Sequence, residues 1–206
     1  MNANLRSTSA VLGFPRIGPQ REVKKALEAY WGDKISAEEL LKVAKEQRLN
    51  TYATIKEQGV DFVPTGTFSL YDHVLDMSNT LGIIPEAYAK SGLSQLDTYF
   101  AMARGHQKGG VDLPATEMKK WFDSNYHYLV PEFSEKSEFK LNDNKPVDDF
   151  IEAKEAGYNA RPVILGPLTL LWLGKTSKDA QDPNFNRYSL LPKLAQTYVQ
   201  LFEKLA

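Results

Sequence analysis

Short apolar runs alternate along the chain with longer stretches in which apolar residues recur every three or four positions. The runs predict buried strands at residues 10–12, 60–64, 125–130 and 161–167. The longer stretches have the spacing of one face of a helix. They predict helices at residues 20–31, 36–55, 70–80, 93–105, 146–157 and 188–206. This alternation is typical of a parallel sheet covered by helices.

Local signals sharpen several of these boundaries. Ser36 followed by Glu39 forms a capping-box pattern that predicts the start of the second helix. Pro19 stands where the first helix could begin, because a first-turn residue needs no N–H partner. Residues 107–114 contain a Gly-Gly pair and a proline, and we interpret them as a loop.

The number of predicted strands is too small for a closed barrel. A (β/α)8 barrel needs eight strands and typically about 250 residues, whereas the pattern predicts four strands in 206 residues. The expected fold is therefore α/β, a partial (β/α)8 TIM-type barrel of about four β/α units. We assign residues 10–206 to it and residues 1–9 to a flexible N-terminus.

Composition narrows the classes of function. The net charge is −1, so no overall field favours nucleic acid or an acidic membrane as a partner. With no cysteine, the chain has no thiolate nucleophile and no cysteine ligand for zinc. No apolar run approaches the roughly 20 residues of a membrane span. The N-terminus also lacks the apolar core of a secretory signal, and a cytoplasmic location is expected.

The first strand leads into the segment most suited to bind an anion. Its loop is broken by Gly13, Pro15 and Gly18, and the following helix start is rich in cations. A helix N-terminus offers free amides and a partial positive charge, so added cations favour a polyanionic ligand. The cations are Arg16, Arg21, Lys24 and Lys25. A solvated outer helix face is the competing interpretation, most clearly for Lys25.

The run from Lys119 to Tyr128 is the densest polar and aromatic stretch. It could present a lysine and an asparagine beside rings that cover a flat heterocycle, or it could be a strand with ordinary packing aromatics. The three histidines are too scattered for a local metal motif. An acid/base pair drawn from Asp72, Asp76 and Asp123 has no support from their spacing.

Four strings together resemble the N-terminal domain of the cobalamin-independent methionine synthase family, which transfers a methyl group from 5-methyltetrahydropteroyltriglutamate to homocysteine. The strings are Gly13-Phe-Pro-Arg-Ile-Gly18 with Arg21-Glu-Val-Lys-Lys25, Phe68-Ser-Leu-Tyr-Asp72, Glu117 to Glu132, and Pro162-Val-Ile-Leu-Gly-Pro167. The match is collinear from about Ser9 to Ala206. The string Lys-Trp-Phe-Asp-Ser-Asn-Tyr-His-Tyr makes chance a poor explanation.

The resemblance implies a protein of two face-to-face barrels with different roles. This chain would form about the first half of the N-terminal barrel. It implies contacts to the triglutamylated folate by Arg21, Glu22, Val23, Lys24, Lys120 and Asn125. It places the zinc and the homocysteine site in the C-terminal barrel, a partner absent from this chain. No catalytic or metal-binding residue is therefore expected here, and the chain alone should be inactive.

Two departures and two alternatives accompany this resemblance. Val23 stands where the family more often has leucine, and Thr65-Gly66 where it more often has Ser-Asn. A purely structural alternative has this domain brace the catalytic barrel, with the basic loop making domain contacts. An independent small β/α enzyme using Asp72 or Asp123 is a further alternative, which would need a complete barrel.

Overall fold

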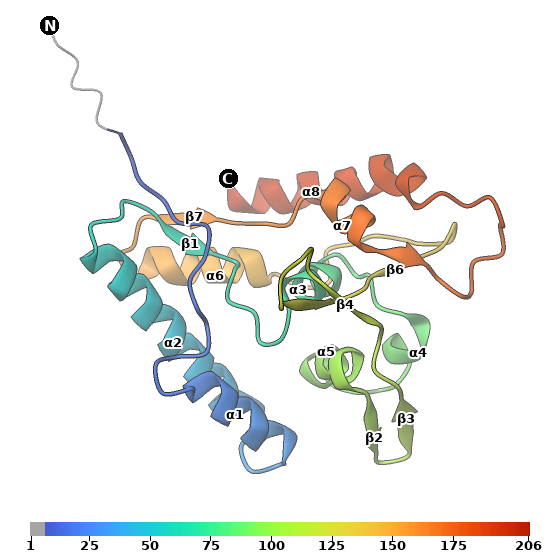
Figure 1. Ribbon diagram of the computed structural model, residues 1–206, viewed down its shortest axis with the longest axis horizontal. Coiled ribbons are helices and arrows are strands. Elements are labelled where there is room, and N and C mark those ends of the chain that lie inside the picture. The colour runs from blue at the N-terminus through green and yellow to red at the C-terminus, as the bar shows by residue number, and fades with distance from the viewer. Residues whose placement is uncertain (1–6) are drawn as a thin grey trace, which may run out of the picture. The chain divides into compact units, whose positions relative to one another are not determined.

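The computed structural model describes residues 7–206, which belong to two compact units. Unit 1 comprises Met1–Leu70 and Pro146–Val163, and unit 2 comprises Tyr71–Lys145 and Ile164–Ala206 (Figure 1). Most of the expected flexible segment, residues 1–6, lies outside the described residues. Ser9 is held in place, because its backbone N–H and its hydroxyl donate to Asp61 Oδ2 at 2.8 and 2.9 Å.

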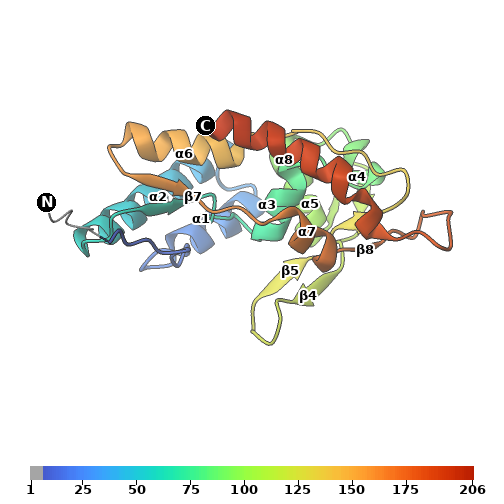
Figure 2. The same cartoon turned by 90° about the horizontal axis from the view of Figure 1, so that it is seen from above.

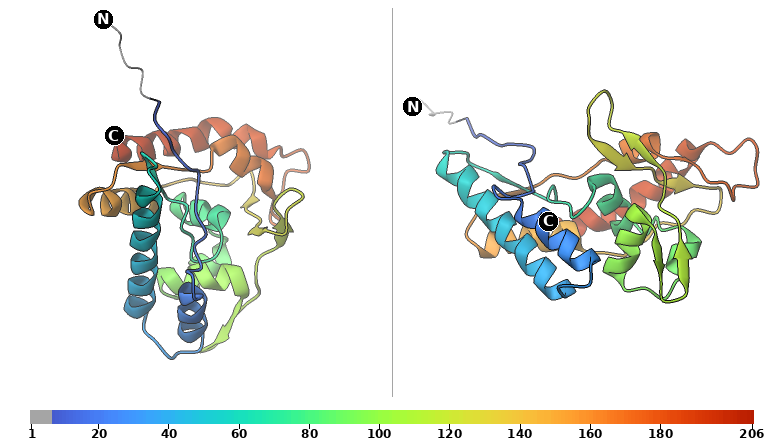
Figure 3. Two further views of the ribbon diagram at one scale, coloured as in Figure 1. Left: turned by 60° about the vertical axis from the view of Figure 1, so that its left-hand side comes forward. Right: turned by 60° about the horizontal axis from the view of Figure 1, so that its bottom comes forward.

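Unit 1 is built on a helical hairpin of α1 (Glu22–Trp31) and α2 (Ala37–Glu57). The capping box at Ser36 is confirmed: its hydroxyl accepts from Glu39 N–H, and the Glu39 carboxylate accepts from Ser36 N–H. The two helices lie side by side in both views of Figure 3. The first helix begins at Glu22 and not beside Pro19, because the chain still turns at residues 18–21.

The sheet of unit 1 is short and parallel. Strand β1 (Val63–Thr65) pairs with β7 (Ala160–Pro162), and Ala10 makes one parallel bridge to Phe62. Helix α6 (Lys145–Glu155) belongs to the same unit. The core of the unit contains Tyr52, Ile55, Val63 and Ala153. The expected buried strand at residues 10–12 is wrong, because a single bridge leaves Leu12 81% exposed.

A part-buried arginine joins α2 to α6. Arg48 Nε and Nη2 donate to the two carboxylate oxygens of Glu152 at 2.8 and 3.0 Å, and Arg48 Nε lies 3.5 Å from Asp149 Oδ1. The guanidinium also lies over the Phe68 ring, 5.5 Å from its centroid. Burial works to raise the pKa of Glu152, but hydrogen bonding and charge from Arg48, helped by Lys45, hold that pKa below its ordinary value.

Unit 2 combines short helices with three pairs of strands. The helices are α3 (His73–Thr80), α4 (Glu86–Ala89), α5 (Gln95–Arg104), α7 (Pro167–Leu173), the 3-10 turn η1 (Arg187–Leu190) and α8 (Leu191–Leu205). The antiparallel hairpins are β2 (His106–Lys108) with β3 (Val111–Leu113) and β4 (Met118–Lys120) with β5 (His127–Leu129). Strands β6 (Glu132–Phe133) and β8 (Lys175–Thr176) are parallel. Figure 2 shows strands β4 and β5 side by side, joined by their connecting loop.

Two expectations for unit 2 are corrected, and two of its helices were not expected. Residues 107–114 are not a loop but most of hairpin β2–β3, which Gly109 and Gly110 close with φ of 60° and 83°. Positive φ at both central positions suits a two-residue hairpin turn. The strand expected at residues 125–130 pairs antiparallel with β4 and is no parallel barrel strand. Helices α4 and α7 were not expected. Each is under two turns long, which is too short to show a helical period of apolar residues.

The fold is mixed α/β, as expected. Within residues 7–206 the strands form two-stranded pieces and close no barrel. None of the helices in that range is both long and apolar enough to cross a membrane.

Candidate functional site

The predicted anion-binding segment forms a tight turn that ends in α1. Arg21 is the residue before the helix and has a left-handed conformation, with φ 62° and ψ 37°. Its N–H donates to the Gly18 carbonyl, and the N–H of Val23 donates to the Ile17 carbonyl, both at 3.1 Å. A left-handed conformation is uncommon for a residue other than glycine. Two backbone hydrogen bonds therefore fix the position of the Arg21 backbone at the end of the turn.

Glycine at position 18 leaves room for the Glu22 carboxylate. Gly18 has φ 83°, and a Cβ on it would lie 2.1 Å from Glu22 Oε2 and 2.8 Å from Gln47 Oε1. Glu22 Oε2 accepts the Gln20 N–H at 3.0 Å. Glu22 thus binds the backbone of the turn, which agrees with a role in positioning its neighbours.

The cations of this segment are exposed, whereas Val23 is not. Arg21, Lys24 and Lys25 all lie on the solvent side of α1. Lys24 Nζ lies 3.6 Å from Glu28 Oε1, a pair exposed on both sides and thus weak. Val23 is 0% exposed, and its N–H is already bonded, so it anchors the turn from the core side.

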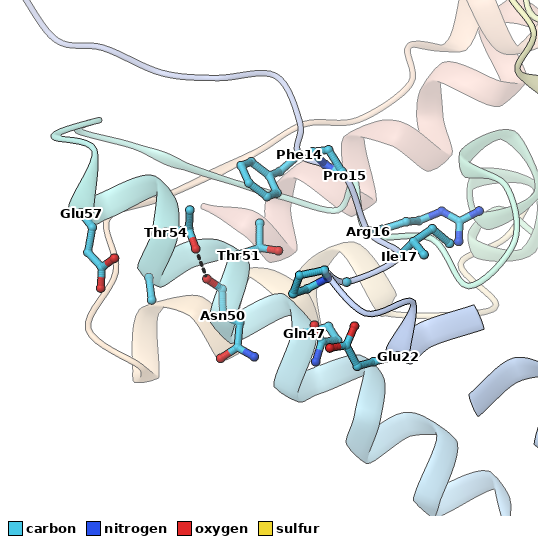
Figure 4. Close-up of a pocket in the computed structure, with 13 residues that line it drawn as sticks. Phe14, Pro15, Arg16, Ile17, Glu22, Gln47, Asn50, Thr51, Thr54 and Glu57 are labelled. Atoms are coloured by element: carbon cyan, nitrogen blue, oxygen red, sulfur yellow. Dashed lines mark hydrogen bonds between the residues drawn. The ribbon is translucent and has the colours of Figure 1, made fainter. Parts of the chain in front are cut away.

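A groove of about 640 Å³ runs between this turn and α2. Figure 4 shows Phe14 and Pro15 facing the part of α2 that carries Asn50 and Thr54, and Glu22 beside Gln47. The lining includes two carboxylates, Glu22 and Glu57, and one guanidinium, Arg16. The charges of the groove do not favour a polyanion. The cationic surface is the exposed side of the first turn of α1.

Lys120 and Asn125 lie on one hairpin of unit 2. Lys120 ends β4 opposite His127 of β5, and Asn125 lies in the connecting loop. Both side chains are exposed. The loop is closed by a 2.7 Å hydrogen bond from Trp121 N–H to the Tyr126 carbonyl. The hairpin therefore presents an ammonium group from the end of β4 and an amide from the connecting loop.

The side chain of Asp72 anchors this hairpin. It is 1% exposed and caps α3, accepting from the N–H groups of Val74 and Leu75 at 3.2 and 2.9 Å. It also accepts from the Tyr126 hydroxyl at 2.9 Å and from Leu129 N–H at 3.0 Å. Four donors saturate the carboxylate. The structure thus gives Asp72 a structural role and not that of a catalytic acid or base.

An aromatic cluster surrounds the base of the hairpin. His73 lies 4.6 Å from Trp121 and 5.5 Å from Tyr126 between ring centroids. Phe122 contacts both Trp121 and the half-exposed Trp172, at 5.1 and 5.3 Å. Phe122 also has a positive φ of 50°. Of these rings, Phe122, Tyr126 and Trp172 are exposed.

The predicted site residues thus form two groups, each well defined within its own unit. Arg21, directly before α1, and Glu22, Val23 and Lys24 in its first turn lie in unit 1. Lys120 and Asn125 lie on one hairpin of unit 2. Sequence reasoning missed the anchoring role of Asp72. Its cap on α3 has a sequence signal, an aspartate directly before an apolar helical stretch, but its bond to Leu129 spans 57 residues. Across residues 7–206, no three His, Asp or Glu side chains gather as metal ligands.

Comparisons with known proteins agree with the resemblance found in the sequence. The family model described as "Cobalamin-independent synthase, N-terminal domain" matches residues 8–206. A Schizosaccharomyces pombe protein named probable 5-methyltetrahydropteroyltriglutamate–homocysteine methyltransferase is 55% identical over 203 residues, covering 96% of this chain and 26% of the relative.

Two further relatives carry the same methyltransferase name without the qualifier. The Saccharomyces cerevisiae protein is 52% identical over 96% of this chain, and the Flavobacterium johnsoniae protein is 49% identical over 94%. The aligned region is 26% and 25% of those relatives. This chain therefore spans about a quarter of the length of the curated relatives it matches.

Proposed function

This chain belongs to the family of cobalamin-independent synthase N-terminal domains, and from that membership we propose that the complete protein transfers a methyl group from 5-methyltetrahydropteroyltriglutamate to homocysteine. The names of relatives that are 55% and 52% identical support this reaction. In this reaction the homocysteine sulfur would attack the methyl carbon as a thiolate. The new S–CH3 bond would form as the bond from that carbon to the folate nitrogen breaks, and the nitrogen would take up a proton. A bound zinc ion would supply the lowered thiol pKa. We assign that step to the part of the protein beyond this chain, because this chain has no cysteine to bind the zinc.

We propose that the role of this chain is to bind the polyglutamate tail of the folate. Arg21 and Lys24 would pair with tail carboxylates from α1, and Lys120 from hairpin β4–β5. Asn125 would hydrogen-bond the ligand, while Glu22 and Val23 hold the turn that carries the cations. The observation that carries the proposal is the exposure of these cations at the start of α1 and at the end of β4. Fixing the tail orients the methyl group without touching it.

We also propose that the short sheet of unit 1 is part of a (β/α)8 barrel. Ala10 bridges Phe62, directly before β1, and β1 pairs with β7, both in parallel. At least one helix follows each of these three segments, as in barrel strands. The rest of that barrel, and a second barrel bearing the zinc and the homocysteine site, would lie in the remaining length of the protein.

A structural role is the second candidate. Leu12, Phe14 and Ile17 are apolar, exposed and close together in sequence, on the same segment as the basic turn. Exposed apolar residues that cluster in this way mark contacts with other protein surface. On this alternative the segment braces another domain, and the cations make domain contacts instead of ligand contacts.

Lysine substitutions separate the two candidates. We expect Lys24→Ala and Lys120→Ala each to weaken binding of the triglutamate form about fivefold to tenfold, since each removes one charge-assisted contact of about 1–1.5 kcal/mol. Binding of the monoglutamate form should change less than about twofold. Lys42→Ala, which removes an exposed lysine of α2, is the control. Calorimetric titration measures both affinities, and equal losses for the two folates would favour the structural candidate.

A further inference from the structure

The side chain of His73 is held in one orientation by its neighbours in unit 2. Its Nδ1 lies 3.1 Å from the Tyr126 hydroxyl, and its backbone N–H donates to the same oxygen at 3.4 Å. The Tyr126 hydroxyl in turn donates to Asp72 Oδ1 at 2.9 Å. The Trp121 ring meets the imidazole edge to face, and the Tyr126 ring stacks on it.

The placement of protons along this chain determines the tautomer. Asp72 accepts from three backbone N–H groups, and the Tyr126 hydroxyl directs its proton to Asp72 Oδ1. A hydroxyl has one proton, so the Tyr126 oxygen can only accept from His73. Nδ1 must therefore carry the proton, and in a neutral ring Nε2 is left with a free lone pair.

Nε2 of His73 remains available for a ligand. It makes no hydrogen bond to any residue in the described range 7–206, and 32% of the side chain is exposed. Burial lowers the pKa of His73, against an opposing effect of the Asp72 charge. The lowered pKa favours the neutral ring, and a neutral imidazole nitrogen accepts a hydrogen bond from a neutral donor.

The surroundings of His73 favour a planar aromatic donor. Trp121, Phe122 and Trp172 form a continuous series of ring contacts from the imidazole outward. Phe122 and Trp172 are more than half exposed. Aromatic surface of this kind packs against flat rings, while Lys120 and Asn125 on the same hairpin suit carboxylates and amides.

We propose that His73 is a ligand-binding residue whose Nε2 accepts an N–H from the p-aminobenzoyl portion of the folate, with Asp72 and Tyr126 fixing its tautomer. This inference rests on the proposed function and assigns the aromatic middle of the ligand to unit 2. That portion joins a benzene ring, an aryl amine N–H and an amide N–H, the combination that the rings and the acceptor fit.

Nitrogen-15 NMR of the histidine side chains tests the tautomer in the chain itself. The wild-type spectrum should show His73 protonated at Nδ1 and not at Nε2 at pH 7. Tyr126→Phe, which removes only the hydroxyl, should release this preference. A proton on Nε2 in the wild-type chain would overturn the proposal.

Paired substitutions test the ligand contact, with p-aminobenzoyl-triglutamate as the probe. In His73→Asn the amide can still donate to Tyr126 but the Nε2 acceptor is lost, and we expect about tenfold weaker binding. In His73→Gln the longer side chain places an amide oxygen near the position of Nε2, and we expect a loss within about threefold. Thermal unfolding of both variants verifies that unit 2 is intact.

The outcomes separate this inference from the function on which it rests. Wild-type affinity in His73→Asn, with binding that still depends on Lys120, would overturn the role of His73 and leave the proposed function standing. Failure of the wild-type chain to bind the probe, or binding insensitive to Lys120→Ala, would overturn tail binding and the His73 assignment with it.

Discussion

Replacing Asp72 with alanine is expected to lower the free energy of unfolding of unit 2 by about 4 kcal/mol. The substitution removes a helix cap, worth about 1 kcal/mol, and leaves buried donors unsatisfied at about 1–3 kcal/mol each. Those donors are the Leu129 N–H and the Tyr126 hydroxyl. Hairpin β4–β5 should lose its anchor to α3. Urea unfolding followed by tryptophan fluorescence measures the loss, because Trp121 lies in that hairpin.

Ser94→Ala is the matched control for this prediction. Ser94 caps α5 by accepting the Asp97 N–H at 3.1 Å, but it is exposed and anchors no other strand. Its loss should cost about 1 kcal/mol, the value of a cap alone. Equal losses for Asp72→Ala and Ser94→Ala would show that the bonds from Asp72 to the hairpin contribute nothing.

The second large effect is expected in unit 1, from Glu152→Ala. Removing the carboxylate leaves the part-buried Arg48 guanidinium with Asp149, 3.5 Å away, as its remaining carboxylate partner. Stranding a fully buried charge costs roughly 3–5 kcal/mol, and the partial exposure of Arg48 and the remaining aspartate should place the loss at about 3 kcal/mol. Glu155→Ala, on the exposed side of the same helix, should change stability by less than about 0.5 kcal/mol. Urea unfolding compares them.

The loss caused by Glu152→Ala should depend on pH with a definite sign. The folded-state pKa of Glu152 is held below its ordinary value of 4.5. The contribution of its charge is therefore complete above the unfolded-state pKa and disappears as the pH falls through the folded-state pKa. Wild type and variant should differ most near neutral pH and converge in acid. A difference that grows as the pH falls would contradict this account of the pair.

The helices were the most predictable part of the fold. Ser36 and Glu39 mark the start of α2 through a local capping box, and both bonds are present. The stripe of apolar residues in the first helix includes Val23, which is fully buried. Such signals act over four residues or fewer, so they can be found in the sequence alone. Apolar periodicity over two or more turns likewise predicted α5, α6 and α8 from the sequence alone.

Strand pairing was less predictable because it depends on distant partners. Residues 127–129 are an apolar and aromatic run, a pattern that does not distinguish a parallel barrel strand from one arm of a hairpin. Residues 10–12 are apolar but make only one bridge, so composition overstated their burial. The Gly109-Gly110 turn did have a sequence signal, since such a pair between short strands indicates a hairpin.

In the candidate site, too, local features were predictable from the sequence and contacts between distant residues were not. The cations at the start of α1 were identified from their spacing, and the residues on the hairpin from a family resemblance. The supports of both groups required coordinates. Glu22 binds the backbone at Gln20, and Asp72 reaches Leu129 across 57 residues. A sequence shows which polar side chains are present, but contacts of that range depend on how the chain folds.

The affinity of this chain for folates of different tail length tests its central role most directly. Calorimetric titration with the triglutamate and monoglutamate forms of 5-methyltetrahydrofolate should give a triglutamate affinity at least about tenfold higher, since each added carboxylate can meet a further cation. Raising the salt concentration should reduce that advantage, because the cations that carry it are exposed. Equal affinities for the two forms at low salt would contradict the account.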